Sequence, residues 1–367
     1  MLLPAMGLLY PLQKNDCMKF EAVTIKDIAK ILGLSTSTVS RALRDSYEIS
    51  PETKQMVLEY ARQINYRPNP IALSLKEKRS RSIGVIVSEI ANSFFSQIIN
   101  GIESIAYSKG YNVIISQSHE SYERELINMD FLSSRSVDGF LISVSTETKD
   151  FKHITDLYER GLPIVFVDRV AGTIDTHKVM ADNFGGAYEA TAHLIKNGYT
   201  TIAHLANSEY LSITKERVAG YRQALADAGM EFDETYIKHC FHGGMIYDEV
   251  DTALNELMSM KKKPDAIFTS ADKLTTNSMR YCRAKDINIP NDLAIVGFSN
   301  LDLTELLSPS LSVVRQPAFD MGELAAELLI KTIESKRAVT EFETRVLPAE
   351  LFIRESSAKK KMLPAKK

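Results

Sequence analysis

The feature that most constrains the fold is a repeated alternation of short apolar runs and helical stretches that begins at Ser82. The first runs are IGVIVS (83–88), YNVIIS (111–116), DGFLIS (138–143) and PIVFVD (163–168), and after 179–183 they resume at 201–206, near 236–241, at 265–270 and at 293–299. Short apolar runs separated by helices predict βαβ units and a parallel, doubly wound sheet. Two such series predict two α/β lobes over residues 82–355, with a ligand cleft beyond the carboxyl ends of the strands.

Residues 22–67 carry a different pattern, which predicts a small all-α helix-turn-helix domain. Ile25, Ile28, Ala29 and Leu32 share one face of a helix that Gly33 ends. Ser35 is a cap for a second helix, and Ser50 with Pro51 is a cap pair for a third helix that closes over the first two. The second helix presents small or hydrogen-bonding side chains of the kind that fit a DNA major groove: Thr36, Ser37, Thr38, Ser40 and Arg41. The simpler alternative is an αα-hairpin with a polar, solvated face.

Residues 68–81 join these two regions. Asn69-Pro70 is a further cap pair and predicts a short helix to about Lys76, with Ile71, Ala72 and Leu75 as its apolar members. Either this segment is a solvated charged linker, or it is a hinge that orders on nucleic acid and inserts Leu75 into the minor groove. Residues 1–21 and the basic tail 356–367 are expected to be disordered extensions.

The charge distribution favours a nucleic-acid-binding head. The formal net charge is −3, yet residues 18–81 hold twelve Lys and Arg against seven Asp and Glu, and Lys359–Lys367 adds five lysines. Residues 82–358 therefore carry −13. The three cysteines form no CxxC pair, which suits a reducing compartment, and no apolar run approaches the ~20 residues that span a bilayer.

The sequence contains no strong catalytic or metal-binding pattern. His239-Cys240-Phe241-His242 offers three ligand types without a fourth partner, which is more typical of packing and loop residues than of a zinc site. Neither GxSxG, GxGxxG nor a Walker A motif occurs. Met245, Met258 and Met260 are expected to fill the core. The sequence therefore supports no enzyme, no metal site and no cofactor.

Longer motifs connect the two regions to a known family. The head contains VTIKDIAKILGLSTSTVSRAL, the linker contains NYRPNPIALSL, and the body contains ANSFF, VDR (167–169), ADNFGGAY (181–188), RVAGY (217–221) and PNDLAIVGF. From Thr24 to about Arg354 the chain resembles the lactose-repressor family of bacterial transcription regulators. The resemblance implies a homodimer whose two heads bind a near-palindromic DNA operator, and a periplasmic-binding-protein-like body that senses a small effector.

The resemblance also implies roles for residues of the head. Thr36 and Ser37 match the positions that choose the operator sequence, Thr38 and Arg41 match further base-facing positions, and Leu75 matches the minor-groove wedge. Arg41 has the geometry to pair bidentately with guanine. The positions that match phosphate contacts or the hinge are Thr24, Ser35, Ser40, Ser50, Tyr66, Asn69 and Ala72.

In the body the resemblance implies an effector site with two departures from the family pattern. The candidate effector-binding residues are Phe94, Phe95, Arg217, His242, Asp272 and Ser299. Ser299 stands where the family usually has Asp, Ala271 stands where a polar ligand contact is common, and Asp272 is expected to cap the helix that follows. These changes leave open an anionic effector, such as a sugar acid or a sugar phosphate, beside a neutral sugar.

Together these features predict a sequence-specific DNA-binding transcription regulator, a repressor in the sense that the family resemblance implies, controlled by a small effector. It is expected in the cytoplasm with the nucleoid and without a membrane partner. The alternative is a solute-binding protein of the periplasmic-binding type with no DNA function, which the body alone would suggest. The sequence also leaves open that the body responds to a protein partner or binds no ligand.

Overall fold

The computed structural model describes residues 23–66 and 79–358 of the 367-residue chain. These residues belong to two compact units, a head within residues 1–80 and a body from Arg81 onward. The predicted extension 1–21, the helix 70–76 and the lysine-rich end lie outside the described residues. Among the described residues, no helix is long and apolar enough to cross a membrane.

The head consists of the three predicted helices, α1 (Ile25–Leu32), α2 (Thr36–Ala42) and α3 (Pro51–Gln63). Gly33 follows α1 with φ of 66°, a left-handed conformation in which glycine meets no steric penalty. Ser35 and Ser50 accept hydrogen bonds from Thr38 N and Thr53 N, so both predicted caps are confirmed. The apolar faces meet in one small core formed by Ile28, Ala29, Val39, Ala42 and Val57.

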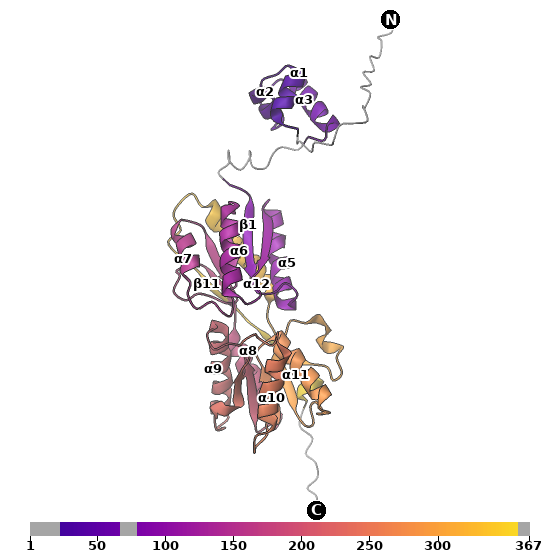
Figure 1. Ribbon diagram of the computed structural model, residues 1–367, viewed down its shortest axis with the longest axis vertical. Coiled ribbons are helices and arrows are strands. Elements are labelled where there is room, and N and C mark those ends of the chain that lie inside the picture. Colours follow the sequence, from indigo (N-terminus) through magenta and orange to yellow (C-terminus); the bar gives the residue numbers. More distant parts are fainter. Residues whose placement is uncertain (1–22, 67–78, 359–367) are drawn as a thin grey trace, which may run out of the picture. The chain divides into compact units, whose positions relative to one another are not determined.

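The first lobe of the body is a parallel sheet between two helix layers (Figure 1). Its strands are β1 (Ser82–Val87), β2 (Asn112–Gln117), β3 (Phe140–Ile142), β4 (Ile164–Val167), β5 (Lys178–Ala181) and β11 (Thr344–Leu347), in the order β11-β5-β4-β3-β1-β2. Its helices are α5 (Ser93–Ser108), α6 (Tyr122–Ser134), α7 (Lys152–Glu159) and α12 (Ala318–Glu334). In β1 the side chains alternate between two cores: Ile83 and Val85 pack toward α5 and α12, while Ile86 packs toward α6 and α7.

The second lobe repeats this architecture with one antiparallel edge strand. Its strands are β6 (Ile202–Ala206), β7 (Ile237–His239), β8 (Ala266–Thr269), β9 (Ala294–Phe298), β10 (Ser312–Arg315) and β12 (Glu350–Phe352), in the order β12-β10-β9-β8-β6-β7. Its helices are α8 (Asn183–Lys196), α9 (Ser212–Asp227), α10 (Tyr247–Met258) and α11 (Asp272–Ala284), with 3-10 turns at Glu234–Tyr236, Asp302–Glu305 and Glu355–Ser357. Helices α8 and α9 cover one face and α10 and α11 the other. The predicted two-lobed α/β fold is confirmed.

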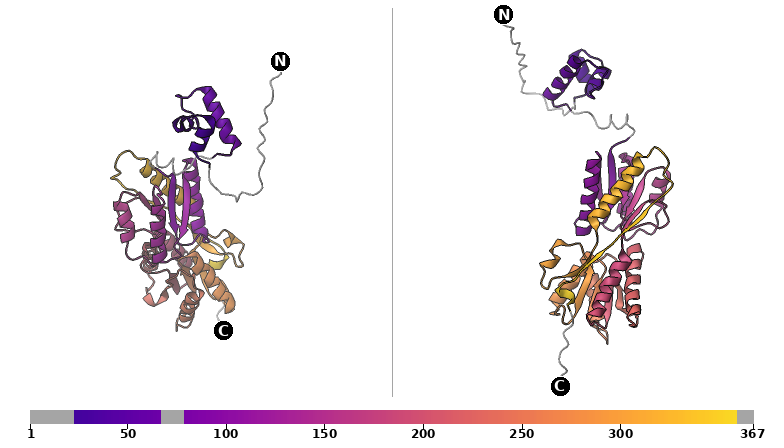
Figure 2. Two further views of the ribbon diagram at one scale, coloured as in Figure 1. Left: turned by 45° about the horizontal axis from the view of Figure 1, so that its top comes forward. Right: turned by 180° about the vertical axis from the view of Figure 1, so that it is seen from behind.

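The chain passes between the lobes after β5, after β10 and between β11 and β12. The last crossing runs along the junction in the rear view (Figure 2). It gives each sheet an edge strand from the same C-terminal segment, which ties the lobes into one unit. Strands β5, β10, β11 and β12 were not identified from the sequence, because they are short and lack the alternation with helices that marked the others.

The structure corrects two expectations about the C-terminal boundary and the core of the body. The predicted disordered tail began at Ser356, yet Ser356 and Ser357 are fully buried, and Ser356 Oγ donates to Ile295 O at 2.7 Å. Ser356 Oγ also accepts from Ser312 N, and Ser357 Oγ donates to Ser312 Oγ, so the folded body extends to Ala358. Met245 was expected in the core, but its side chain is 43% exposed, whereas Met258 and Met260 do pack on the α10–α11 core.

Candidate functional site

The first candidate site is the outer face of α2 in the head. Val39 and Ala42 anchor the helix in the core, and their burial turns Thr36, Ser37 and Arg41 toward solvent. Ser35 Oγ lies 2.7 Å from Ser37 Oγ and 2.8 Å from Thr38 Oγ1. The small hydroxyls at the start of α2 are therefore held in one hydrogen-bonded group beside the positive end of the helix, a place that favours anionic partners.

Arg41 extends from the last turn of α2 and is held by a residue outside the helix. Its Nη1 lies 3.0 Å from Glu48 Oε2, and the two side chains are 57% and 45% exposed. An exposed pair of this kind contributes little stability. The guanidinium is consequently available to another acceptor at small energetic cost.

The other head residues occupy the ends of the helices. Thr24 N and Thr24 Oγ1 donate to Asp27 Oδ2 at 2.8 and 2.7 Å, and these bonds lower the pKa of the Asp27 carboxyl. Ser40 and Tyr66 are half-buried, and burial raises the pKa of the Tyr66 phenol. Asn69, Ala72 and Leu75 lie outside the described residues.

The second candidate site is a cleft between the two lobes of the body. Its cavity has a volume of about 50 Å³, room for a few water molecules in this arrangement of the lobes. Five of the six sequence-predicted effector residues line it: Phe94, Phe95, Arg217, Asp272 and Ser299. They come from α5 in the first lobe and from α9, α11 and the end of β9 in the second. Only the folded body brings them together.

Arg217 is the most strongly positioned group in this cleft. Its side chain is buried, and its guanidinium carbon lies 3.8 Å from the centroid of the Phe298 ring. Nε donates to Asn183 Oδ1 at 2.9 Å, and Nη1 donates to the carbonyl of Ser270. Burial lowers the pKa of the guanidinium to about 10, which still leaves it charged at neutral pH. The arrangement presents a fixed cation with oriented donors to the cavity.

Asp272 does not cap its helix, which corrects the expectation from the sequence. Ala271 is the N-cap residue of α11, and it makes no side-chain cap bond. The Asp272 carboxylate instead accepts a hydrogen bond from Ser299 Oγ, and burial raises its pKa. Ser299 and Asp272 thus form one hydrogen-bonded pair at a wall of the cleft.

Sequence reasoning missed much of the cleft lining. The additional polar residues are Asn92, Asp168, Arg169, Asn207, Asn300 and Gln316. Five of them directly follow strands β4, β6, β9 or β10 or lie within two residues of their ends. The carboxyl ends of parallel strands are where ligands bind in such sheets, so this position was the signal that could have identified them. Asp168 and Arg169 belong to the VDR motif that follows β4.

A buried ion pair adjoins the cleft in the first lobe. Arg169 Nη1 and Nη2 donate to the two carboxylate oxygens of Glu120 at 2.6 and 3.0 Å, and both side chains are about nine-tenths buried. Burial alone would raise the pKa of Glu120, but the charge and hydrogen bonds of Arg169, together with Thr146, lower it to about 2. This pair fixes Arg169 at the cleft wall.

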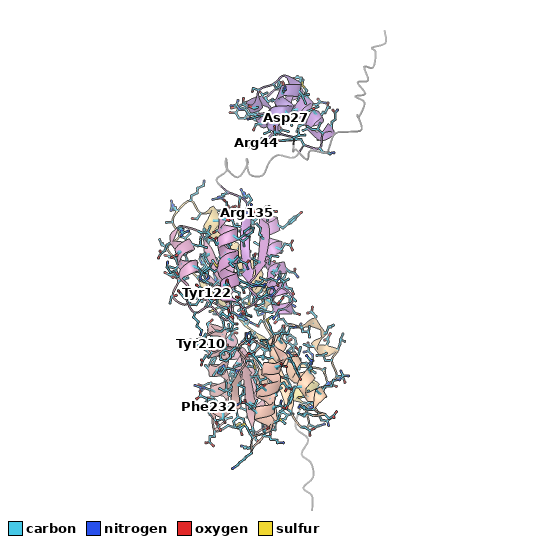
Figure 3. All side chains as sticks on the ribbon, viewed as in Figure 1. Asp27, Arg44, Tyr122, Arg135, Tyr210 and Phe232 are labelled. Carbon is cyan, nitrogen blue, oxygen red and sulfur yellow. The ribbon has the colours of Figure 1, made fainter. Side chains whose placement is uncertain are left out.

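Direct contacts cross between the lobes at the edge of the cleft. Asn300 Nδ2 donates to Gln97 Oε1 at 2.8 Å, and Gln97 Nε2 donates to Asn300 O at 3.2 Å. Lys149 Nζ lies 4.0 Å from the ring centroid of Tyr210, which is labelled near the junction in Figure 3. These polar contacts hold the lobes together and can exchange with solvent when the lobes separate.

His242 lies apart from the other predicted effector residues. It lines a neighbouring cavity, and its Nδ1 lies 2.7 Å from Glu249 Oε1. Cys240 is buried, where burial raises its thiol pKa to about 12, and His239 Nδ1 is close to the carbonyl of Asn207. Within residues 23–66 and 79–358, no group of three or more His, Cys, Asp or Glu side chains is placed to hold a metal ion.

Two family models match the chain. Residues 24–69 match the model of bacterial regulatory proteins of the lacI family. Residues 80–354 match the model of periplasmic binding proteins and the sugar-binding domain of that family. Together the matches cover the head and nearly all of the described body.

Curated relatives agree with these matches over almost their whole length. The chain is 32% identical over 338 residues to the HTH-type transcriptional repressor PurR of Vibrio campbellii, covering 92% of this chain and 99% of that protein. It is also 32% identical to the catabolite control protein A of Priestia megaterium over 310 residues, which is 84% of this chain and 92% of that protein.

Solved structures show the same architecture. A transcriptional regulator CelR–cellobiose complex is 30% identical, with a TM-score of 0.68 and coverage of 91% of this chain and 99% of that one. The lac repressor dimer bound to operator and the anti-inducer ONPF has a TM-score of 0.76 over 92% of this chain and 100% of that one. At 22% identity, the latter supports the fold alone.

Proposed function

The chain belongs to the lacI family of bacterial regulatory proteins, and on that premise we propose how it acts as a DNA-binding transcriptional repressor. It binds a near-palindromic operator as a homodimer, under the control of a small carbohydrate in the interlobe cleft. The observation that carries this proposal is the coexistence in one chain of an exposed, donor-rich α2 and a buried, pre-arranged polar cleft. It works in the cytoplasm, on the nucleoid, and catalyses no reaction.

In the head, Thr36, Ser37, Thr38 and Arg41 read base edges in the major groove. Thr24, Ser35, Ser40, Ser50, Tyr66 and Asn69 contact the phosphate backbone and fix the register of the head without reading sequence. This division is supported by the exposure of α2 and by the position of the serine caps at helix N-termini, where phosphates bind well.

The homodimer is supported by apolar side chains that are exposed on one chain. In the first lobe, the edge strand β2 exposes Ile114 and Ile115 by 37% and 38%. In the second lobe the exposed apolar side chains are Phe241, Met245, Ile246, Leu303 and Leu306. A second copy that covers these surfaces would remove them from water and bring two heads to one operator, whose symmetry then mirrors that of the protein.

The cleft chemistry favours a neutral polyhydroxyl effector over an anion. Glu120 is already paired with Arg169, and the side chains of Asp168 and Asp272 line the same cleft as Arg169 and Arg217. A sugar acid or sugar phosphate would therefore meet carboxyl groups beside both arginines. Asn92, Asn207, Asn300 and Gln316 add amides, and Phe94 and Phe95 add apolar walls suited to the carbon face of a sugar. The cellobiose complex of CelR is a relevant precedent.

Control of DNA binding arises from the arrangement of the two lobes. In one arrangement the hinge segments of the two subunits pair, order on DNA and place Leu75 and Ala72 at the minor groove. In the other arrangement the hinge segments are held apart, and DNA binding loses the contribution of the minor-groove contacts. The effector shifts this equilibrium only through its different affinities for the two arrangements.

Operator selection followed by a salt titration tests the proposal. The protein should enrich a near-palindromic sequence from a random DNA pool, and its binding constant should fall steeply with salt because phosphate contacts release counterions. The stoichiometry of the complex should be one DNA duplex per two protein chains. A solute-binding protein without DNA function, the alternative that the body alone suggests, would enrich no sequence and show no such salt dependence.

A further inference from the structure

The turn between α2 and α3 carries a carboxylate for which the sequence predicted no role. Glu48 Oε2 lies 3.0 Å from Nη1 of Arg41, the residue of α2 proposed to read a base, and both side chains are about half exposed. An exposed ion pair contributes little to stability, so stability alone does not account for this contact. Its notable consequence is a negative charge placed directly beside a base-reading cation.

The backbone of this turn is held in place, so Glu48 is presented from a fixed position. Ser46 N donates to the carbonyl of Arg41 at 3.1 Å, which ties the turn to the last turn of α2. Ser46 Oγ accepts from Glu48 N at 3.4 Å, and Ile49, the next residue, packs on the core of the head. Arg41 and Glu48 therefore belong to two segments that the fold keeps together before DNA binds.

The other acidic residues of the head have different surroundings. Residues 23–66 contain five, which are Asp27, Asp45, Glu48, Glu52 and Glu59. Asp27 and Glu52 lie in the first turns of α1 and α3, where the helix dipole stabilises a carboxylate. Asp45 and Glu59 are bonded to side chains of α3. Among the acidic residues of this range, Glu48 alone pairs with a residue that is proposed to read bases.

The ion pair leaves much of the Arg41 guanidinium available to a base. A guanidinium has five N–H donors in a planar fork, and Glu48 is the only ion-pair partner of Arg41 in the described part of the chain. Contact through Nη1 leaves the edge formed by Nε and Nη2, which can donate together to O6 and N7 of guanine. Because Glu48 restricts the orientations of this edge beforehand, less side-chain entropy is lost when the guanine contact forms.

The same carboxylate disfavours DNA that offers no guanine at this place. Phosphate oxygens meet a negative charge beside Arg41, and like charges repel. Non-specific binding depends on the attraction between cations and phosphates, so an arginine already paired with a carboxylate contributes less to it. Discrimination is a difference between two affinities, and Glu48 lowers the affinity for the wrong DNA.

We propose that Glu48 is a specificity-determining residue of the head: it positions the Arg41 guanidinium for one guanine of the operator and weakens binding to DNA without that guanine. Glu48 contacts no base in this scheme and acts through Arg41. The inference rests on the proposed function, because it requires that the outer face of α2 reads the operator.

The test uses the full-length protein and the operator that the wild type selects from a random DNA pool. A second selection with Arg41→Ala identifies the base pair at which the preference for guanine depends on Arg41. Gel-shift titrations at one salt concentration then compare three duplexes. These are the operator, the operator with that G·C pair replaced by A·T, and scrambled DNA.

Glu48→Gln should raise the affinity for scrambled DNA about three- to tenfold, because one negative charge near the phosphates is removed. Its affinity for the operator should stay within about threefold of the wild type. We expect the penalty for replacing the G·C pair, roughly 10- to 100-fold in the wild type, to fall by at least about threefold. Glu59→Gln removes the same charge from an exposed residue of α3 and, as the matched control, should leave this penalty unchanged.

A double-mutant cycle separates positioning from direct base reading. In the Arg41→Ala background, Glu48→Gln should no longer change the base preference at that pair. Glu48→Asp, which keeps the carboxylate on a shorter side chain, should retain most of the low affinity for scrambled DNA. Both positions are exposed, and the thermal midpoint of each variant checks that the head is folded.

Three results would overturn the inference. Glu48→Gln could leave the penalty unchanged, Glu59→Gln could lower it equally, or Glu48→Gln could alter the base preference in the absence of Arg41. The second result would assign the effect to the net charge of the head, and the third would make Glu48 a base-reading residue itself.

Failure of the inference can be told apart from failure of the proposed function. If the wild type selects no sequence, operator binding is wrong and the role of Glu48 is wrong with it. If an operator is selected but Arg41→Ala relaxes no position, operator binding stands and the inference is wrong. If Arg41→Ala relaxes one position, the variants of Glu48 decide its role alone.

Discussion

The DNA-facing surface of the head and the interlobe cleft of the body recognise ligands by opposite physical means. The head presents polar groups of one short helix to solvent, and its central charged pair, Arg41 with Glu48, is about half exposed. The cleft collects polar groups from distant segments and buries them, as with Arg217 and the Glu120–Arg169 pair. In the head, polar interactions acquire strength only when DNA excludes water; in the cleft, the fold has already desolvated and oriented them.

This contrast predicts that loss of charge is most damaging in the body. Glu120→Gln leaves Arg169 as a buried cation without its carboxylate and should destabilise the body by about 3 to 5 kcal/mol. Chemical denaturation of the variant measures this change. Glu234→Gln, which removes the exposed partner of Arg222, is the control and should cost less than about 1 kcal/mol. Similar losses for both variants would remove the distinction between buried and exposed pairs.

The same pair predicts a pH dependence. Because the folded-state pKa of Glu120 is about 2, below the ordinary 4.5, the stabilisation is fully present above 4.5 and is lost as pH falls toward 2. The difference in midpoint between wild type and Glu120→Gln should therefore narrow in that acidic range and stay constant above it. A difference that is independent of pH throughout would contradict the assigned ionisation.

Within the cleft, Arg217→Lys should separate charge from geometry. Lysine keeps the positive charge but cannot stack on Phe298 while donating to both Asn183 and Ser270. We expect the dissociation constant of the best-binding sugar to rise roughly 10- to 100-fold, as when one or two charged hydrogen bonds are lost. Calorimetric titration measures it, with the exposed Arg222→Lys on the same helix as control. Unchanged affinity would show that the positive charge at position 217 is sufficient for sugar binding without the geometry of the guanidinium.

In the head, Arg41→Ala should act on binding and leave stability almost unchanged. Loss of a bidentate base contact should weaken operator binding by about 1–3 kcal/mol while sparing binding to unrelated DNA. Gel-shift titrations on the selected operator and on scrambled DNA at one salt concentration measure both. Arg62→Ala, on α3, is the control. Equal losses on both DNAs would assign Arg41 to the phosphate backbone instead.

The smallest expected effect concerns a helix cap. Ser50→Ala removes the acceptor for Thr53 N and should lower the stability of the head by about 1 kcal/mol, whereas Ser50→Thr keeps a hydroxyl and should retain most of it. Thermal unfolding of the head followed by circular dichroism compares the two. If both variants lose the same stability, the hydroxyl is not the stabilising group. Either result also bears on DNA binding, since the same hydroxyl is proposed to contact phosphate.

The sequence by itself determined the elements whose signals are local. The caps Ser35 and Ser50, the turn at Gly33 and the apolar runs of β1 to β4 and of β6 to β9 all follow from residues within a few positions of one another, and the structure has them where the pattern predicted. The motifs of head and body also sufficed to identify the family. Local patterns succeed because capping, turn formation and helical or strand periodicity are short-range effects.

Only the tertiary structure decided how the cleft is made. Asp168, Arg169, Asn207, Asn300 and Gln316 became ligand-facing because the carboxyl ends of separate strands converge, which a one-dimensional pattern does not reveal. The tertiary structure also pairs Asp272 with Ser299 instead of making it a helix cap. It places His242 in a neighbouring cavity and buries Ser356 and Ser357. In each case the outcome depended on which distant groups were brought into hydrogen-bond range or shielded from water, and long-range packing alone settles that.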